Sequence, residues 1–216
     1  LKCKIYATPF TAVLIQEKFK EKKIDITNYL KIVELNSQIK LGPFEIDFVT
    51  LTHSILEPNG LSITTPEGVI LHTGDWKVDP NPLIGNKVDE KKLKSIGEKG
   101  VIAMICDSTN VFSPGRAGSE KDVRESLLKI ISNQKKRVLV TSFASNVARM
   151  ESIFYIAKQT KRNIALVGRS MNRIYKAAKQ CGYLNDVIDP IDTREANKIS
   201  RDRIIFLCTG SQGEPM

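Results

Sequence analysis

The pattern of hydrophobic and polar residues changes along the chain, and the change lies near residue 110. In the first half, short apolar runs separated by Gly and Pro turns predict strands at 30–36, 44–53, 61–65 and 69–75. Apolar residues at near-helical spacing predict one helix in this half, over Thr8–Lys22. The first half is therefore expected to be rich in β-sheet.

From Val101 onward, strands and helices alternate regularly. Apolar runs predict strands at 101–108, 138–143, 164–170 and 203–211, with helices between them over 119–133, 145–160 and 171–180. Ser119 followed by Asp122 resembles a capping box at the start of the first of these helices. Continuous apolar strands are typical of a mostly parallel sheet with helices on both faces. The sequence therefore predicts an α/β fold.

Composition narrows the class of protein. With 41% hydrophobic residues in 216, the chain can bury a substantial core, and it contains no apolar run of about 18 residues that would predict a membrane span. The four cysteines are widely scattered, which predicts neither a disulfide framework nor a thiolate zinc site. The first residues do not resemble a signal peptide, so a cytoplasmic setting is expected. A start without Met, inside an apparent strand, predicts a fragment of a longer protein.

The charge balance is basic, with 33 Lys and Arg against 24 Asp and Glu and a net charge of +9. This excess is compatible with a polyanionic partner, because basic side chains displace counterions from phosphates. Simple solvation is the better explanation for much of the excess, since the runs KFKEKK, EKKLKS and NQKKR fall on expected helix faces and turns.

Two histidines are present, and each lies at or near the end of a predicted strand. His53 closes the strand at 44–53, and Asp75 follows the strand that contains His72, so His53 and Asp75 could converge at one edge of a sheet. An imidazole and a bridging carboxylate could help to hold two cations that generate hydroxide for phosphodiester hydrolysis. Alternatively, Asp75 caps the turn at GDWK and His53 is a hydrogen-bonded strand end.

Polar turns follow several strands of the second half. Asp107 comes directly after an apolar strand, where it is either a functional carboxylate or the cap of the next turn. Ser142, Ser145 and Asn146 precede a helix that contains Arg149, so hydroxyls, amides and a guanidinium could point toward one anion. The same layout recurs with Arg169, Ser170 and Arg173, and again with Ser211 and Gln212. Carboxyl ends of parallel strands line one crevice, so these turns predict either a common binding site for phosphate groups or helix caps without a ligand.

Five segments, in this order, resemble ribonuclease J enzymes of the metallo-β-lactamase and β-CASP kind. They are HSILEPNGLSITTPEGVILHTGDWKVD, CDSTN, TSFASNVARM, LVGRSMNR and TGSQGEP. The resemblance covers nearly the whole chain. It implies that residues 1–109 are the C-terminal part of the first metallo-β-lactamase segment, of αββα type. Residues 110–216 are then an incomplete, Rossmann-like β-CASP domain with a parallel sheet.

The resemblance also implies a reaction. The expected protein is a zinc-dependent ribonuclease with two zinc ions per intact active site, acting as a 5′-to-3′ exonuclease and endonuclease in RNA processing, including that of rRNA, and in RNA decay. By resemblance His53 is a metal ligand, Asp75 bridges the two metals, Asp107 orients a catalytic histidine, and Ser145 binds phosphate. His72 also matches a family position, where it either supports the metal ligands or has a purely structural role. The partners implied are single-stranded RNA and further copies of the protein, as a dimer or tetramer.

The chain departs from the family pattern in two respects. The family's HxHxDH metal motif and its later histidine motifs are absent, so the chain alone is expected to lack a complete dinuclear site and to be inactive. The family's HSIPD is HSILEP here, with Glu57 as a candidate replacement for the acidic residue. Two alternatives stay open: a metallo-β-lactamase-fold hydrolase acting on DNA or a small ester, and a non-catalytic α/β module that binds a phosphate or nucleotide.

Overall fold

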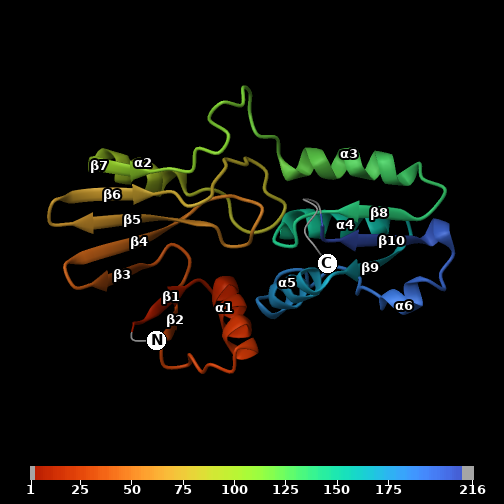
Figure 1. Ribbon diagram of the computed structural model, residues 1–216. Coiled ribbons are helices and arrows are strands. Elements are labelled where there is room, and N and C mark those ends of the chain that lie inside the picture. The colour runs from red at the N-terminus through yellow and green to blue at the C-terminus, as the bar shows by residue number, and fades with distance from the viewer. Residues whose placement is uncertain (1–2, 211–216) are drawn as a thin grey trace. The chain divides into compact units, whose positions relative to one another are not determined.

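The computed structural model describes residues 3–210 and divides the chain into two compact units (Figure 1). Unit 1 comprises Leu1–His53 and Glu57–Gly118, and unit 2 comprises Ser54–Leu56 and Ser119–Met216. The predicted α/β class is confirmed. The assignment of 1–109 and 110–216 to two family domains stays a prediction. No helix among the described residues has the length and apolar character needed to cross a bilayer.

Unit 1 contains two sheets. Its elements are β1 (Ile5–Ala7), α1 (Pro9–Glu21), β2 (Leu30–Ile32), β3 (Gln38–Leu41), β4 (Phe44–Thr50), β5 (Asn59–Thr65), β6 (Gly68–His72), α2 (Glu90–Glu98) and β7 (Val101–Ile105). β1 and β2 form a parallel pair, and the other strands form a sheet of order β3-β4-β5-β6-β7. This sheet is antiparallel except for the parallel pair β6 and β7.

The helices of unit 1 are fixed by their ends and by one buried face each. The predicted helix at Thr8–Lys22 is confirmed as α1, which packs Ala12 into a cluster with Ala7, Ile26 and Leu30. Asp89 caps α2 by accepting a hydrogen bond from the Lys92 amide. Helix α2 contributes Ile96 to a second cluster, with Val49 and Val69 of the larger sheet. The larger sheet is thus anchored on one face by α2.

Strand β7 differs from the expectation that apolar strands are covered on both faces. Ile102 and Met104 are 61% exposed and Ile105 is 56% exposed. Among residues 3–210, β7 is the outer strand of its sheet, so the side chains of a neighbouring strand flank it on one side only.

Unit 2 is a parallel sheet with helical connections. Its elements are α3 (Glu120–Ser132), β8 (Val138–Thr141), α4 (Val147–Gln159), β9 (Asn163–Val167), α5 (Arg169–Gln180), α6 (Thr193–Ala196), the 3-10 helix η1 (Arg201–Arg203) and β10 (Ile204–Cys208). The strand order is β8-β10-β9, with both pairs parallel. Figure 1 shows β10 between β8 and β9. The predicted parallel sheet and its three long helices are therefore confirmed.

Local signals in the sequence explain where these helices begin. The predicted capping box forms at α3, where the Asp122 carboxylate accepts a hydrogen bond from the Ser119 amide. Asn146 caps α4 through its side-chain oxygen, which accepts from the Arg149 amide at 2.8 Å. Helix α4 buries Ile153, Phe154 and other apolar residues almost completely, and each fully buried side chain of this size stabilises the fold by roughly 1.5–3 kcal/mol.

Candidate functional site

Three strands of unit 1 end at the same edge of the larger sheet. β4 is antiparallel to β5, β5 is antiparallel to β6, and β6 is parallel to β7, so the carboxyl ends of β4, β6 and β7 lie together. His53 lies three residues beyond β4, Asp75 three residues beyond β6, and Asp107 two residues beyond β7. The topology therefore brings the three predicted site residues of unit 1 to one edge of the larger sheet. We call it the carboxylate edge, after the side chains of Asp75 and Asp107.

A bridge beyond the strand ends holds two of these segments together. Thr52 pairs with Lys77 in an isolated antiparallel bridge, in which the Lys77 amide donates to the Thr52 carbonyl at 2.9 Å. The Thr52 hydroxyl also accepts from the Asp79 amide at 2.9 Å. His53 is adjacent to one member of this bridge, and Asp75 is two residues from the other, so the bridge fixes both segments at the carboxylate edge.

Asp107 is attached to the same edge by hydrogen bonds. Its amide donates to the Thr73 hydroxyl at 3.1 Å, and the Thr73 amide donates to the Ile105 carbonyl at 2.9 Å. The Thr109 hydroxyl and amide both donate to the Asp107 carboxylate and lower its pKa, and His53 and the Trp76 amide act in the same direction. The carboxylate is therefore ionised throughout the pH range in which a histidine titrates.

Two other residues of the family-like segment have structural partners. The His72 ring accepts a hydrogen bond through Nδ1 from the Gly74 amide at 3.0 Å. Glu57 is 8% exposed, and its carboxylate accepts from the Phe10 amide at 2.8 Å, in the first turn of α1. Thr8, the N-cap residue of α1, makes no side-chain capping bond, so Glu57 satisfies this helix end across 47 residues of sequence.

The donors at the carboxylate edge are of the right type for a metal but too few to enclose one. Imidazole and carboxylate are common zinc ligands, and a zinc site normally has four ligands. Among residues 3–210, no group of three or more His, Cys, Asp or Glu side chains is arranged to hold a metal ion. His53 and Asp75 therefore fit a metal as part of a ligand set that other residues would have to complete.

The predicted phosphate-binding residues of unit 2 lie at the carboxyl edge of its sheet. Because β8, β9 and β10 are parallel, the segments that follow them meet at that edge. Ser142 is buried and its amide donates to the Cys208 carbonyl, which joins the ends of β8 and β10. Ser145 is exposed beside the cap residue Asn146. Ser211 lies outside the described residues.

The turn after β9 is held against the end of β10 by a close backbone approach. Gly168 has φ +112°, and a Cβ added to it would lie 2.6 Å from the Thr209 hydroxyl. Arg169 and Ser170 follow this glycine in the first turn of α5, and both are exposed. Their backbone amides stand at the positive end of a helix dipole, which favours anions.

Arg149 is already paired within unit 2. Its Nε lies 3.1 Å and its Nη2 3.3 Å from the two carboxylate oxygens of Glu120, at the start of α3. Glu120 is 7% exposed, so the pair is largely screened from water. Arg149 therefore presents less unneutralised charge at the carboxyl edge than the exposed Arg169 does.

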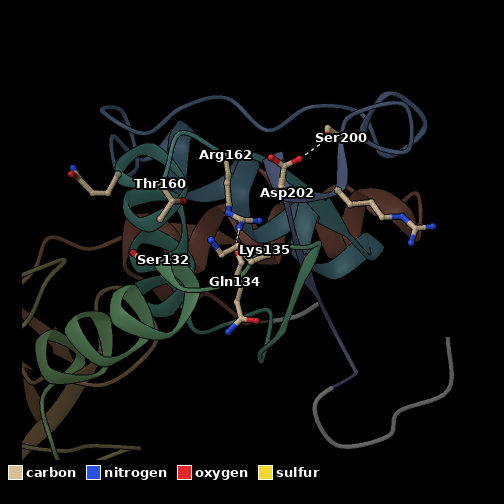
Figure 2. A pocket seen from close by; sticks show the side chains of 9 residues that line it. Ser132, Gln134, Lys135, Thr160, Arg162, Ser200 and Asp202 are labelled. Atoms are coloured by element: carbon tan, nitrogen blue, oxygen red, sulfur yellow. Dashed lines mark hydrogen bonds between the residues drawn. The ribbon is translucent and has the colours of Figure 1, made fainter.

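A cavity of about 780 Å³ lies at the opposite end of the unit 2 sheet. Figure 2 shows Arg162 and Lys135 among its lining side chains. None of the residues predicted to bind RNA lines this cavity.

Three residues that hold the predicted site residues in place were not predicted from the sequence. Thr73 and Thr109 position Asp107, and Glu120 pairs with Arg149. The Asp-x-Thr spacing of CDSTN is a recognisable local turn signal and could have identified Thr109. Thr73 and Glu120 act on residues 34 and 29 positions away, so no local pattern identifies them.

Comparison with known proteins agrees with this architecture. Residues 135–216 match the family model described as Ribonuclease J, beta-CASP domain. The chain is 40% identical over 213 residues to a Ribonuclease J of Sinorhizobium meliloti, covering 98% of this chain and 37% of that protein. It is 40% identical over 215 residues to a Ribonuclease J of Corynebacterium glutamicum, covering 98% of this chain and 29% of that protein.

A solved structure, of a protein of unknown function from Enterococcus faecalis V583, shares the fold with a TM-score of 0.64 at 16% identity, over 95% of this chain and 52% of that one. The chain spans only about a third of the length of these ribonuclease relatives, 37% and 29%. It matches them over nearly its own full length, and its second half matches the family's β-CASP model. These matches identify the proteins named Ribonuclease J as relatives of this chain, over about a third of their length.

Proposed function

We propose that the protein containing this chain is a metal-dependent ribonuclease that hydrolyses RNA phosphodiester bonds during RNA processing and decay. The observation that carries the proposal is that His53, Asp75 and Asp107 follow three strands whose carboxyl ends lie at one edge of the same sheet. The relatives named Ribonuclease J support RNA as the substrate. Both 5′-to-3′ exonucleolytic and endonucleolytic cleavage are proposed, with 5′-phosphorylated products.

His53 and Asp75 would serve as two of the ligands of a pair of zinc ions. The ions would supply hydroxide at neutral pH and offset charge on the scissile phosphate. Asp75 would supply carboxylate oxygens to the two ions, and His53 would supply an imidazole nitrogen. Asp107 would accept a hydrogen bond from the N–H of a catalytic histidine that lies outside these 216 residues, and this bond would fix the tautomer of that ring. The depressed pKa of Asp107 keeps its carboxylate charged for this role.

The carboxyl edge of unit 2 is proposed to bind the backbone of single-stranded RNA. Its members are Ser142, Ser145, Asn146, Arg149, Arg169, Ser170 and Ser211. Arg169 is the strongest electrostatic contact of this set, because it is exposed while Arg149 is paired with Glu120. We further propose a cytoplasmic enzyme that assembles as a dimer or tetramer.

The two histidines provide a matched test of the metal site. In the full-length protein, His53→Ala and Asp75→Asn should each reduce cleavage of a labelled RNA by at least about 100-fold, with loss of bound zinc measured by elemental analysis. His72→Ala is the control, because His72 accepts only a backbone amide among the bonds described for it, and it should retain zinc and most activity. Full activity in His53→Ala would reject His53 as a metal ligand, whereas absence of cleavage by the unmodified protein would favour a non-catalytic phosphate-binding module.

The RNA-binding edge has its own test. Arg169→Ala should weaken binding of single-stranded RNA and reduce the slope of log K against log salt by about one unit. Lys176→Ala removes the same charge from an exposed position in the middle of α5 and should leave the slope unchanged. Equal slopes for the two variants would remove Arg169 from the RNA path.

A further inference from the structure

The net charge of the chain is concentrated in unit 2. Residues 119–216 contain 18 Lys and Arg against 10 Asp and Glu, so unit 2 carries +8 of the net charge of +9. Unit 1 contains 15 Lys and Arg against 14 Asp and Glu, and is almost balanced. An explanation of the basic character of the chain must therefore be sought within unit 2.

Three short segments hold this whole excess. Residues 133–137, 158–162 and 198–203 contain nine basic residues and one acidic residue, Asp202, so their net charge is +8. The rest of unit 2 has nine basic and nine acidic residues and is neutral overall. We call the nine the amino-edge cluster: Lys135, Lys136, Arg137, Lys158, Lys161, Arg162, Lys198, Arg201 and Arg203.

The topology brings the three segments together. Each one directly precedes a strand: β8, β9 and β10 begin at Val138, Asn163 and Ile204. The strands are parallel neighbours with the register Ile204 to Asn163 and Ile205 to Val138, so their amino ends lie at one edge. Hydrogen-bonded strands are about 4.8 Å apart, which places the segments within roughly 10 Å of one another. Charges that are separate in sequence therefore form one basic surface.

The basic surface contains a cavity, and one arginine of the cluster is hydrogen-bonded to the backbone beneath it. The cavity of about 780 Å³ lies between the three segments, and its lining includes Arg201 together with Lys135 and Arg162, which are labelled in Figure 2. Arg162 is 7% exposed, and its guanidinium donates to the Gln134 carbonyl and to the Lys136 carbonyl, the latter at 2.9 Å. Arg162 thereby fixes the segment that carries Lys135 and Lys136, while these two lysines remain exposed.

The other neutral lining side chains are polar, and two of their hydroxyls already donate within the protein, Thr160 to the Ile156 carbonyl and Ser200 to Asp202. Hydroxyls and amides alternate with the cations, from Ser132, Gln134, Gln159, Thr160 and Ser200. Such groups, with Lys and Arg, are the usual contacts to nucleic-acid phosphates. The lining contains no aromatic side chain on which a base could stack. Asp202, the single acid, accepts a hydrogen bond from the Ser200 hydroxyl, and this bond lowers its pKa.

We propose that the amino-edge cluster is a second RNA-binding surface, which holds the sugar-phosphate backbone of single-stranded RNA at the end of the sheet opposite the predicted carboxyl-edge path. Binding there is independent of base sequence and sensitive to salt, because long exposed cations make it. The inference rests on the proposed RNA substrate. It assigns to these residues retention of long RNA rather than cleavage.

The test compares two variants of the full-length protein with equal loss of charge. Lys135→Ala with Arg201→Ala removes two exposed cations from the cluster. The control, Lys176→Glu, removes the same two units of charge from the middle of α5. Equilibrium binding of a uridine homopolymer of about 30 nucleotides is measured at several salt concentrations, and cleavage of an RNA of about 4 nucleotides is measured in parallel.

The double variant should bind the long RNA more weakly, with a salt slope smaller by about 1.4 units, and should cleave the short RNA at the unchanged rate. An unchanged slope, or the same change in the control, would overturn the inference. If the double variant lost binding to polyglutamate but bound RNA as the unmodified protein does, the inference would also be overturned, in favour of an acidic protein partner. Failure of short-RNA cleavage in the unmodified protein would count against the proposed function instead, so the two ideas fail separately.

Discussion

Replacing Gly168 with alanine should destabilise unit 2 and disturb the turn that carries Arg169. The residue has φ +112°, where an L side chain costs about 1–2 kcal/mol. The new Cβ would also lie 2.6 Å from the Thr209 hydroxyl and 3.3 Å from its methyl carbon, and such overpacking costs about 1–3 kcal/mol. The expected loss in the free energy of unfolding is therefore about 3 kcal/mol, measured by urea denaturation.

A double-mutant cycle separates these two costs. Thr209→Ala removes both side-chain atoms that Gly168→Ala would meet closely, so in that background the glycine substitution should cost only the backbone strain of about 1–2 kcal/mol. An equal cost in both backgrounds would show that the contact with Thr209 is not what requires glycine. A cost below about 0.5 kcal/mol in the unmodified background would refute the reasoning altogether.

Three further predictions concern unit 1 and the cysteines. Glu57→Ala should lower the free energy of unfolding by about 2 kcal/mol, because it leaves the Phe10 amide without its acceptor; Glu57→Gln keeps an acceptor oxygen and should lose less, and the reverse order in urea denaturation would contradict the capping role. Asp107 has a lowered pKa, so its contribution to stability is complete above the unfolded-state pKa of about 3.9 and is lost as the pH falls through the lower folded value. Asp107→Asn should therefore flatten the fall in stability at acid pH, and parallel acid profiles for the two proteins would reject this linkage. Burial raises the pKa of the Cys208 thiol, so iodoacetamide at pH 8 should alkylate the exposed Cys3 well before Cys208, as followed by peptide mass spectrometry; equal rates would contradict it.

The parts of the fold that the sequence predicted are those with local signals. The long helices α3 and α4 follow the capping residues Ser119 and Asn146, and each has apolar residues at helical spacing. Their predicted positions were therefore confirmed to within a few residues. Helix α2, strand β3 and helix α6 were not predicted. Strand β3 and helix α6 have four residues each, too few for a periodic pattern to be read, and α2 has only two apolar side chains, Leu93 and Ile96, in nine residues.

The candidate sites were predictable only up to the point where neighbouring strands must be known. The positions of His53, Asp75 and Asp107 beyond strand ends could be read from the chain, but their common edge depends on the order of β4, β5, β6 and β7. The Glu57 cap of α1 and the pairing of Glu120 with Arg149 join residues 47 and 29 positions apart. The predicted roles of these residues in metal and RNA binding stay predictions.

The basic runs of the sequence illustrate the same limit and lead to a physical distinction between the two ends of the unit 2 sheet. NQKKR was interpreted from the sequence as a solvated helix face or turn, because its neighbours in space were unknown. With β10 between β8 and β9, this run joins Lys161 and Arg201 at one edge. Exposed cations attract phosphates over about 8 Å at physiological salt, whereas capped helix ends and hydroxyls act only at hydrogen-bonding distance. The amino edge is thus suited to capture RNA and the carboxyl edge to fix its register, so raising the salt concentration should reduce retention of long RNA before it alters where the chain is cut.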